Sequence, residues 1–165
     1  MKTPAHVINI IIKRGLGFPY TRSWLKSVVN AVLLGENTEC PMEVNCLVTD
    51  DENVRKLNLR YRGIDKPTDV LSFALEEGPA GGTVVDFPPG PGVPGKFGDI
   101  VISYPRAAAQ AADLGHDVKH ELALLLVHGT LHLLGYDHQA PPEARRMRKR
   151  EKAILGMLSG VDEKG

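Results

Sequence analysis

Three histidines lie within the segment HGTLHLLGYDH, residues 128–138, and they are half of the six histidines in the chain. On a helix, His128 and His132 would lie on the same face, about 6 Å apart along the axis, so both imidazoles could direct a nitrogen to one metal ion. Gly135 can adopt the left-handed conformation that ends a helix, and the following turn would bring His138 back towards the pair. Three histidine ligands with a fourth position open to water are typical of a catalytic zinc site.

The sequence indicates the ligands more clearly than the identity of the metal. A single histidine on an apolar helix usually has a structural role, but the pair, the glycine and the third histidine together predict a site for one divalent ion. Imidazole ligands suit zinc, nickel and copper, and we expect zinc, with nickel as the alternative. The other three histidines, His6, His116 and His120, lack this spacing and are expected to be solvated.

The spacing resembles the HExxHxxGxxH motif of the metzincin peptidases, with one departure. Gly129 stands where those enzymes carry the glutamate that takes the proton from the attacking water. A peptidase without this group would lack its general base, which argues against proteolysis. The general base is therefore left unassigned, with hydroxide held by the metal and Asp137 as the two candidates.

The elements that must position these residues are strands and helices in the first two thirds of the chain and helices in the last third. Residues 122–127 are apolar nearly all round, which is typical of a buried central helix. The pattern predicts one α+β domain over residues 1–165, with a small mixed β-sheet packed by helices and a Gly/Pro-rich exposed excursion at 78–95. Strands are expected at 6–12, 42–49, 69–74 and 99–104, and helices at 21–35, 50–63, 107–115, 117–134 and after Pro142.

Composition limits the environment of the protein. The chain has 20 basic and 20 acidic residues and is 42% hydrophobic, which is ordinary for a globular protein. No apolar run approaches the roughly 18 residues that a membrane span needs. The two cysteines form no disulfide framework, and Cys46 is expected to be buried in a strand. We expect a cytoplasmic protein with no membrane association.

The segment HGTLHLLGYDH closely resembles the signature of the YbeY family of bacterial endoribonucleases. Three further segments match the pattern of that family in the same order: LNLRYRGIDKPTDVLSF (57–73), FGDIVIS (97–103) and ELALLLV (121–127). The resemblance implies a metal-dependent, single-strand-specific endoribonuclease that acts in ribosomal RNA maturation, at the 3′ end of the small-subunit RNA, and in ribosome quality control. It implies RNA as the substrate and small ribosomal subunit proteins as candidate partners.

The resemblance also implies site residues. It assigns the metal to His128, His132 and His138 at the end of the central helix, in a metzincin-like site, and assigns a catalytic role to Arg62. A guanidinium can hold a phosphate through two parallel hydrogen bonds, although an arginine at a helix C-terminus can also be a solvated residue that the helix dipole favours. The nearby Asp65, Thr68 and Asp69 are explained by turn capping and strand entry, with cleft lining as the alternative.

A basic run, EARRMRKREK at 143–152, has six positive and two negative side chains. A solvated helix face is the ordinary explanation, and contact with RNA phosphate is the sharper one. Two other functions stay open. A metallopeptidase-like hydrolase would need a base from elsewhere, and a ribosome-associated binding protein with a structural metal would need a fourth protein ligand on the ion.

Overall fold

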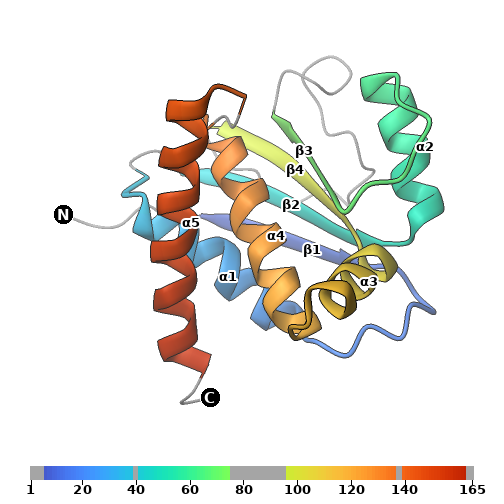
Figure 1. Cartoon of the computed structure of the whole chain (residues 1–165), viewed down its shortest axis with the longest axis horizontal. Helices are drawn as coiled ribbons and strands as arrows, with labels where there is room; N and C mark the ends of the chain where they lie inside the picture. Colours follow the sequence, from blue (N-terminus) through green and yellow to red (C-terminus); the bar gives the residue numbers. More distant parts are fainter. Residues whose placement is uncertain (1–5, 39–40, 75–95, 137–138, 163–165) are drawn as a thin grey trace.

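The structure is a computed structural model that describes residues 6–38, 41–74, 96–136 and 139–162 (Figure 1). The Gly/Pro-rich excursion at 78–95 and the pair Asp137 and His138 lie outside these residues. The described strands are β1 (Val7–Ile12), β2 (Met42–Thr49), β3 (Val70–Ala74) and β4 (Lys96–Ser103). The described helices are α1 (Arg22–Gly35), α2 (Asp51–Arg62), α3 (Tyr104–Leu114), α4 (Val118–Leu133) and α5 (Pro141–Asp162).

The four strands form one mixed sheet in the order β1-β2-β4-β3. Strands β1, β2 and β4 are parallel, and β3 pairs with β4 in the antiparallel direction. Helix α1 crosses over from β1 to β2, which parallel neighbours require. The mixed sheet and its helices confirm the predicted α+β class.

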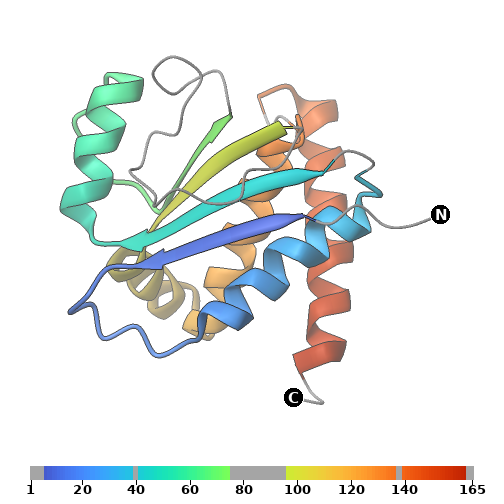
Figure 2. The ribbon, with the colours of Figure 1, turned by 180° about the vertical axis from the view of Figure 1, so that it is seen from behind.

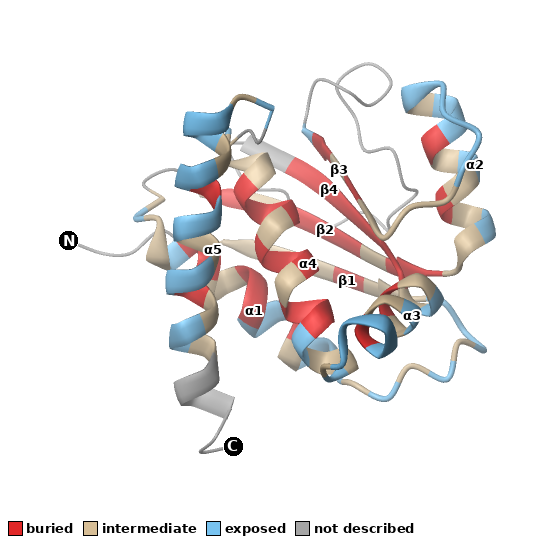
Figure 3. Cartoon of the chain, in the orientation of Figure 1, coloured by how far each residue is buried: buried red, intermediate tan, exposed pale blue. Residues whose placement is uncertain are grey.

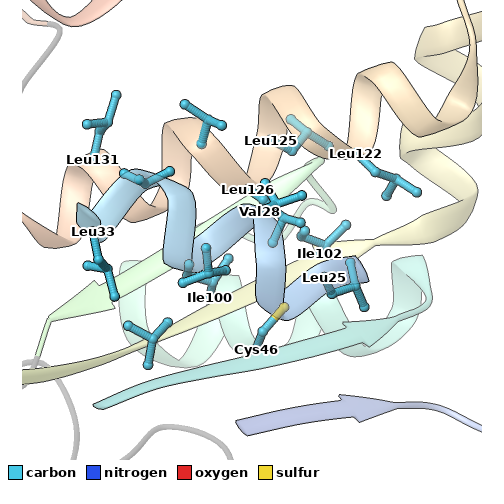
Figure 4. Packing of buried hydrophobic residues seen from close by; sticks show 14 of the residues in the cluster. Leu25, Val28, Leu33, Cys46, Ile100, Ile102, Leu122, Leu125, Leu126 and Leu131 are labelled. Carbon is cyan, nitrogen blue, oxygen red and sulfur yellow. The ribbon is translucent and has the colours of Figure 1, made fainter. Parts of the chain in front are cut away.

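Helices cover both faces of the sheet, but unequally. Figure 1 shows α1, α4 and α5 in front of the strands, and Figure 2 shows the same helices behind them. The main core lies on this side, where apolar side chains of α1, α4 and the strands, among them Leu33, Leu131 and Ile100, meet in one cluster (Figure 4). A smaller cluster on the other side contains Val54 of α2 and Phe73 of β3.

Helix α4 is the central helix that the sequence predicts. Nine of its sixteen residues are buried, and Figure 3 shows buried residues along most of its length. Cys46, which the sequence predicts to be buried in a strand, is fully buried in β2, and Met147 and Ile154 of α5 are fully or almost fully buried as well. Helix α4 packs against β3 and β4 of the sheet and against α1 and α5.

Several helix ends agree with the sequence. Thr21 caps α1 by accepting a hydrogen bond from the Trp24 N–H at 3.1 Å, and Asp50 caps α2 in the same way. Gly63 ends α2 with φ of +72°. Helix α5 begins at Pro141, two residues before its expected start after Pro142.

One expected helix end was right in position but wrong in conformation. Helix α1 ends at Gly35 as the sequence predicts, but Gly35, a plausible C′ residue from the sequence, is its last helical residue and is not left-handed. Asn37 instead has the positive φ of 51°. The amides of Asn37 and Thr38 bond to the carbonyls of Leu34 and Leu33, which is the Schellman arrangement, and asparagine tolerates the left-handed position.

Helix α3 begins at Tyr104, although the sequence placed Tyr104 at the end of a strand and began the helix at Ala107. Ser103 is the reason, because its hydroxyl caps the helix by accepting a hydrogen bond from the Arg106 N–H at 3.3 Å. Strand β4 therefore passes into α3 without a connecting loop.

Candidate active-site cleft

The two histidines of α4 form the base of a cleft. His128 and His132 lie one turn apart, with their ring centroids 4.8 Å apart and their planes inclined by 77°. Both side chains line a cavity of about 530 Å³, together with residues of β3 and with Gln139. The geometry that the i, i+4 spacing predicts for the pair is present.

Gly129, between the two histidines, lies against the sheet. Its carbonyl accepts a hydrogen bond from the Ser72 hydroxyl at 3.2 Å. A Cβ atom on Gly129 would lie 3.0 Å from that hydroxyl oxygen and 3.2 Å from Cγ2 of Ile100. Any side chain at this position would therefore require Ser72 and Ile100 to shift by a few tenths of an ångström, so glycine allows α4 to lie close to the sheet here.

A carboxylate from α5 orients the first histidine. Nδ1 of His128 lies 2.7 Å from Oε1 of Glu151, whose side chain is only 14% exposed. A histidine that donates its Nδ1–H to a carboxylate carries its lone pair on Nε2, which is the form and orientation that metal-binding histidines usually have.

Sequence reasoning missed Glu151, because it counted this residue only as one of the negative charges in the basic run. A signal was present. Glu151 lies four residues after Met147 and three before Ile154, on the face of α5 that the apolar pattern turns inward. A carboxylate on a buried helix face needs a partner, and His128 supplies it.

The turn that leads out of α4 agrees with the sequence. Gly135 has φ of +100°. The Tyr136 N–H bonds to the Leu131 carbonyl and the Gly135 N–H to the His132 carbonyl, again in the Schellman arrangement. The chain therefore reverses where the motif predicts, directly before Asp137 and His138.

Side chains fasten this turn to α1. The Tyr136 hydroxyl donates to Oε2 of Glu36 at 2.7 Å, and Nε of Arg150 donates to Oε1 of the same carboxylate at 2.5 Å. Burial, with the hydrogen bond to Glu36, raises the pKa of Tyr136. One carboxylate thus connects the end of α1, the turn after α4 and the middle of α5.

Arg62 reaches the same cleft from α2. Its guanidinium lies over the Phe73 ring, with Cζ 4.9 Å from the centroid, and Nη2 donates to the Ser72 carbonyl at 2.7 Å. Arg62 lines the cavity with His128 and His132, although 66 positions separate it from His128 in the sequence. The fold therefore brings together the arginine and the two described histidines of the predicted site.

The DKPTD segment is divided between structural and cleft positions. Asp69 lines the cleft, but its Oδ1 accepts from the Val70 N–H at 2.8 Å and from the Thr68 hydroxyl at 3.2 Å, and its Oδ2 accepts from Gln110 at 3.1 Å. The Thr68 hydroxyl, by this hydrogen bond, helps to hold the Asp69 carboxylate in position. Asp65 is exposed and pairs with Arg55. Strand entry therefore accounts for Asp69, as the sequence suggests, and cleft lining applies to it as well.

The expectation that the three remaining histidines are solvated was wrong for two of them. His116 lies 2.5 Å from the carboxylate of Glu121, which is 3% exposed. His6 accepts a hydrogen bond from the Met42 N–H at 3.0 Å, and burial lowers the pKa of His6. Only His120 is exposed. In the first two cases an apolar neighbourhood favours a partnered imidazole, which spacing alone does not reveal.

The described residues contain no group of three His, Cys, Asp or Glu side chains that could hold one ion. The pair on α4 accounts for two of the expected ligands, and His138 lies outside the described residues. Within the same residues, no helix is both long enough and apolar enough to cross a bilayer.

Comparison with known proteins gives a consistent result. The model of the family described as Endoribonuclease YbeY matches residues 15–159. Endoribonuclease YbeY of Roseiflexus castenholzii is 46% identical over 142 residues, which are 86% of this chain and 85% of that protein. The protein of the same name from Chloroflexus aurantiacus is 50% identical over 129 residues, 78% of this chain and 80% of that one.

A solved structure is similar in fold. The solution structure of a Thermotoga maritima protein superposes with a TM-score of 0.55 at 22% identity and covers 96% of each chain. At that identity, the likeness concerns the fold alone.

Proposed function

The chain belongs to the Endoribonuclease YbeY family, and from this premise we propose that it is a metal-dependent endoribonuclease that cuts single-stranded ribosomal RNA. Its substrate would be the precursor of the small-subunit RNA near the 3′ end, in the cytoplasm, with roles in maturation and quality control. Small ribosomal subunit proteins are the partners that such a substrate brings close.

The observation that carries the proposal is the meeting of Arg62 with His128 and His132 in one cleft. A cation that can grip a phosphate and a pair of imidazoles that can hold an ion come from different elements and face the same space. This combination suits phosphodiester hydrolysis, in which negative charge develops on the phosphate in the transition state.

The residues around the cleft fit a metal ion. His128 and His132, with His138 as the third ligand, would hold it, and the carboxylate at Nδ1 of His128 is the outer contact that such ligands normally have. Zinc is the expected ion and nickel the alternative. When bound, the ion would polarise a phosphoryl oxygen and lower the pKa of its water.

Arg62 would hold the scissile phosphate. The Ser72 carbonyl and the Phe73 ring fix the plane of its guanidinium, so little side-chain entropy is left to lose on binding. A guanidinium presents its N–H donors in a rigid fork that matches the geometry of a phosphate. Charge that builds up on the phosphate would thus meet a donor that is already in place.

The general base would come from outside α4, because Gly129 has no side chain where the metzincins carry their glutamate. Asp137, next to the third histidine, is the protein group that we propose for this role. Asp69 would shape the cleft wall and position substrate, and Thr68 would support it through their hydrogen bond.

Incubation of metal-loaded protein with single-stranded and structured RNA tests the proposal. A variant with His128, His132 and His138 replaced by alanine, purified in parallel, controls for contaminating nucleases. We expect the wild type to cut single-stranded RNA, the variant to leave it intact, and neither to cut casein. Casein cleavage without RNA cleavage would instead indicate a peptidase. Equal RNA cleavage by both proteins would refute the assignment of the site.

A further inference from the structure

Helix α5 carries a row of cations that the cleft does not explain. Arg145, Arg148, Lys149 and Lys152 are exposed, and Figure 3 shows exposed residues along the outer side of α5. None of these four side chains forms an ion pair or a hydrogen bond with another residue in the described part of the chain. Arg150, in contrast, is half-buried and bound to Glu36.

The contacts of α5 show which way this row faces. Glu151 points towards α4, where it meets His128, and Arg150 points towards α1. At 100° per residue, Arg148 lies about 60° and Lys152 about 100° round the helix from Glu151, on the side away from Arg150. Arg145 follows at about 120°, which aligns it with these two. We call Arg145, Arg148 and Lys152 the basic stripe.

The basic stripe lies on the helix whose Glu151 contacts His128 of the cleft. It starts beside the His128–Glu151 contact and runs about 10 Å along the helix, since seven residues separate Arg145 from Lys152. Three cations over that length can contact successive phosphates of one strand. Gln139, two residues before α5, lines the cleft itself, so the start of α5 is close to it.

The stripe also has a cost within the helix. Arg148 and Lys152 are like charges at i and i+4, and Arg145 and Arg148 are like charges at i and i+3, and both spacings destabilise a helix. The chain has 20 acidic residues, enough to neutralise such pairs, and a surface that is only solvated usually mixes the two signs. A row of unneutralised cations next to a cleft is what a polyanion would select.

We propose that the basic stripe is the track on which the phosphates of single-stranded RNA approach the cleft, an inference that rests on the proposed function. A membrane surface fits less well. The apolar side chains Met147 and Ile154 of α5 are buried in the core, so they are not available for insertion into lipid. Binding of RNA phosphates, in contrast, needs only the positive charges of the stripe.

The test compares two triple variants with the same change in charge. One carries Arg145→Gln, Arg148→Gln and Lys152→Gln. The control carries Arg14→Gln, Arg22→Gln and Lys26→Gln, three exposed cations near β1, at the opposite edge of the sheet from β3. Binding of a labelled single-stranded oligodeoxynucleotide, which has the phosphates but no 2′-hydroxyl, is measured by anisotropy at several salt concentrations.

We expect the slope of log Kd against log salt to fall by about 2 in the stripe variant, since each lost phosphate contact removes about 0.7. The control should keep the wild-type slope. For RNA cleavage, kcat/KM should fall roughly tenfold or more in the stripe variant alone.

Equal slopes of log Kd against log salt in the two variants, or no oligonucleotide binding by the wild type, would refute the proposed phosphate track. So would loss of binding to phosphatidylserine vesicles in the stripe variant while its oligonucleotide binding is unchanged, which would point to a membrane instead. Stripe-dependent binding by a wild type that cuts no RNA would refute the proposed function and leave the track standing.

Discussion

Removal of the Glu151 carboxylate should weaken metal binding although Glu151 is not itself a predicted ligand. Its Oε1 lies 2.7 Å from Nδ1 of His128 in a largely buried contact. Loss of such an outer contact typically lowers metal affinity about 10- to 100-fold, which is about 1.4–2.7 kcal/mol. Glu151→Ala removes the acceptor, and its loss of metal affinity should lie near the upper end of this range. Glu151→Gln keeps an amide oxygen as an acceptor and should lie near the lower end.

The assay is competition for zinc with a chromophoric chelator, with far-UV circular dichroism to show that each variant is folded. Glu143→Gln is the matched control, because it removes the same charge from an exposed position on the same helix. Metal affinity should follow the order wild type, Glu151→Gln, Glu151→Ala, with the control equal to wild type. If folded Glu151→Ala binds zinc as tightly as Glu143→Gln does, the carboxylate does not orient His128.

Three further predictions concern other residues. Arg62→Lys should keep its metal and fold yet lose RNA cleavage on the order of 10²-fold, because an ammonium lacks the two-pronged geometry; cleavage within about twofold of wild type at equal metal loading would contradict this. Gly135→Val should cost about 1–2 kcal/mol or more in urea unfolding and weaken metal binding, because a β-branched residue is strained at φ of +100°; unchanged stability and affinity would show that the turn does not need glycine. Burial raises the pKa of the Cys46 thiol to about 12, so in a Cys40→Ser background Ellman's reagent at pH 8 should react only after unfolding. Because the folded state holds this thiol protonated, stability should fall as the pH rises above the ordinary thiol pKa of 9.0, and a thiol that reacts at once in the native protein would refute the assignment.

Local patterns predicted the parts of the site that lie on one helix. The apolar run before His128 and the glycine after His132 set the course of α4 and its end, because both signals act within a few residues. The conformation at the end of α1 was misjudged by the same reasoning, since Asn37 can take the left-handed position that Gly35 was expected to take. Glycine has the higher propensity for the left-handed conformation, but the hydrogen bonds that close the end of α1 place Asn37 at that position.

Contacts between elements were beyond local patterns. The contact between Glu151 and His128 depends on how α5 packs on α4, because 23 positions separate the two residues in the sequence. The close approach of Gly129 to Ile100 likewise depends on the distance between a helix and a sheet. Only the family resemblance linked Arg62 with the two histidines whose cavity it lines, because no spacing rule connects the end of α2 with α4.

The two sides of the cleft are anchored with unequal strength. His128 and His132 lie on a helix with nine buried residues, whereas α2, which carries Arg62, buries only Val54 and Asn58. Regions with few buried apolar contacts open locally at lower free energy than the core does. Transient fraying of α2 would therefore withdraw Arg62 while the histidine pair stays in place, so the arrangement that we propose for RNA cleavage would be lost before the protein unfolds.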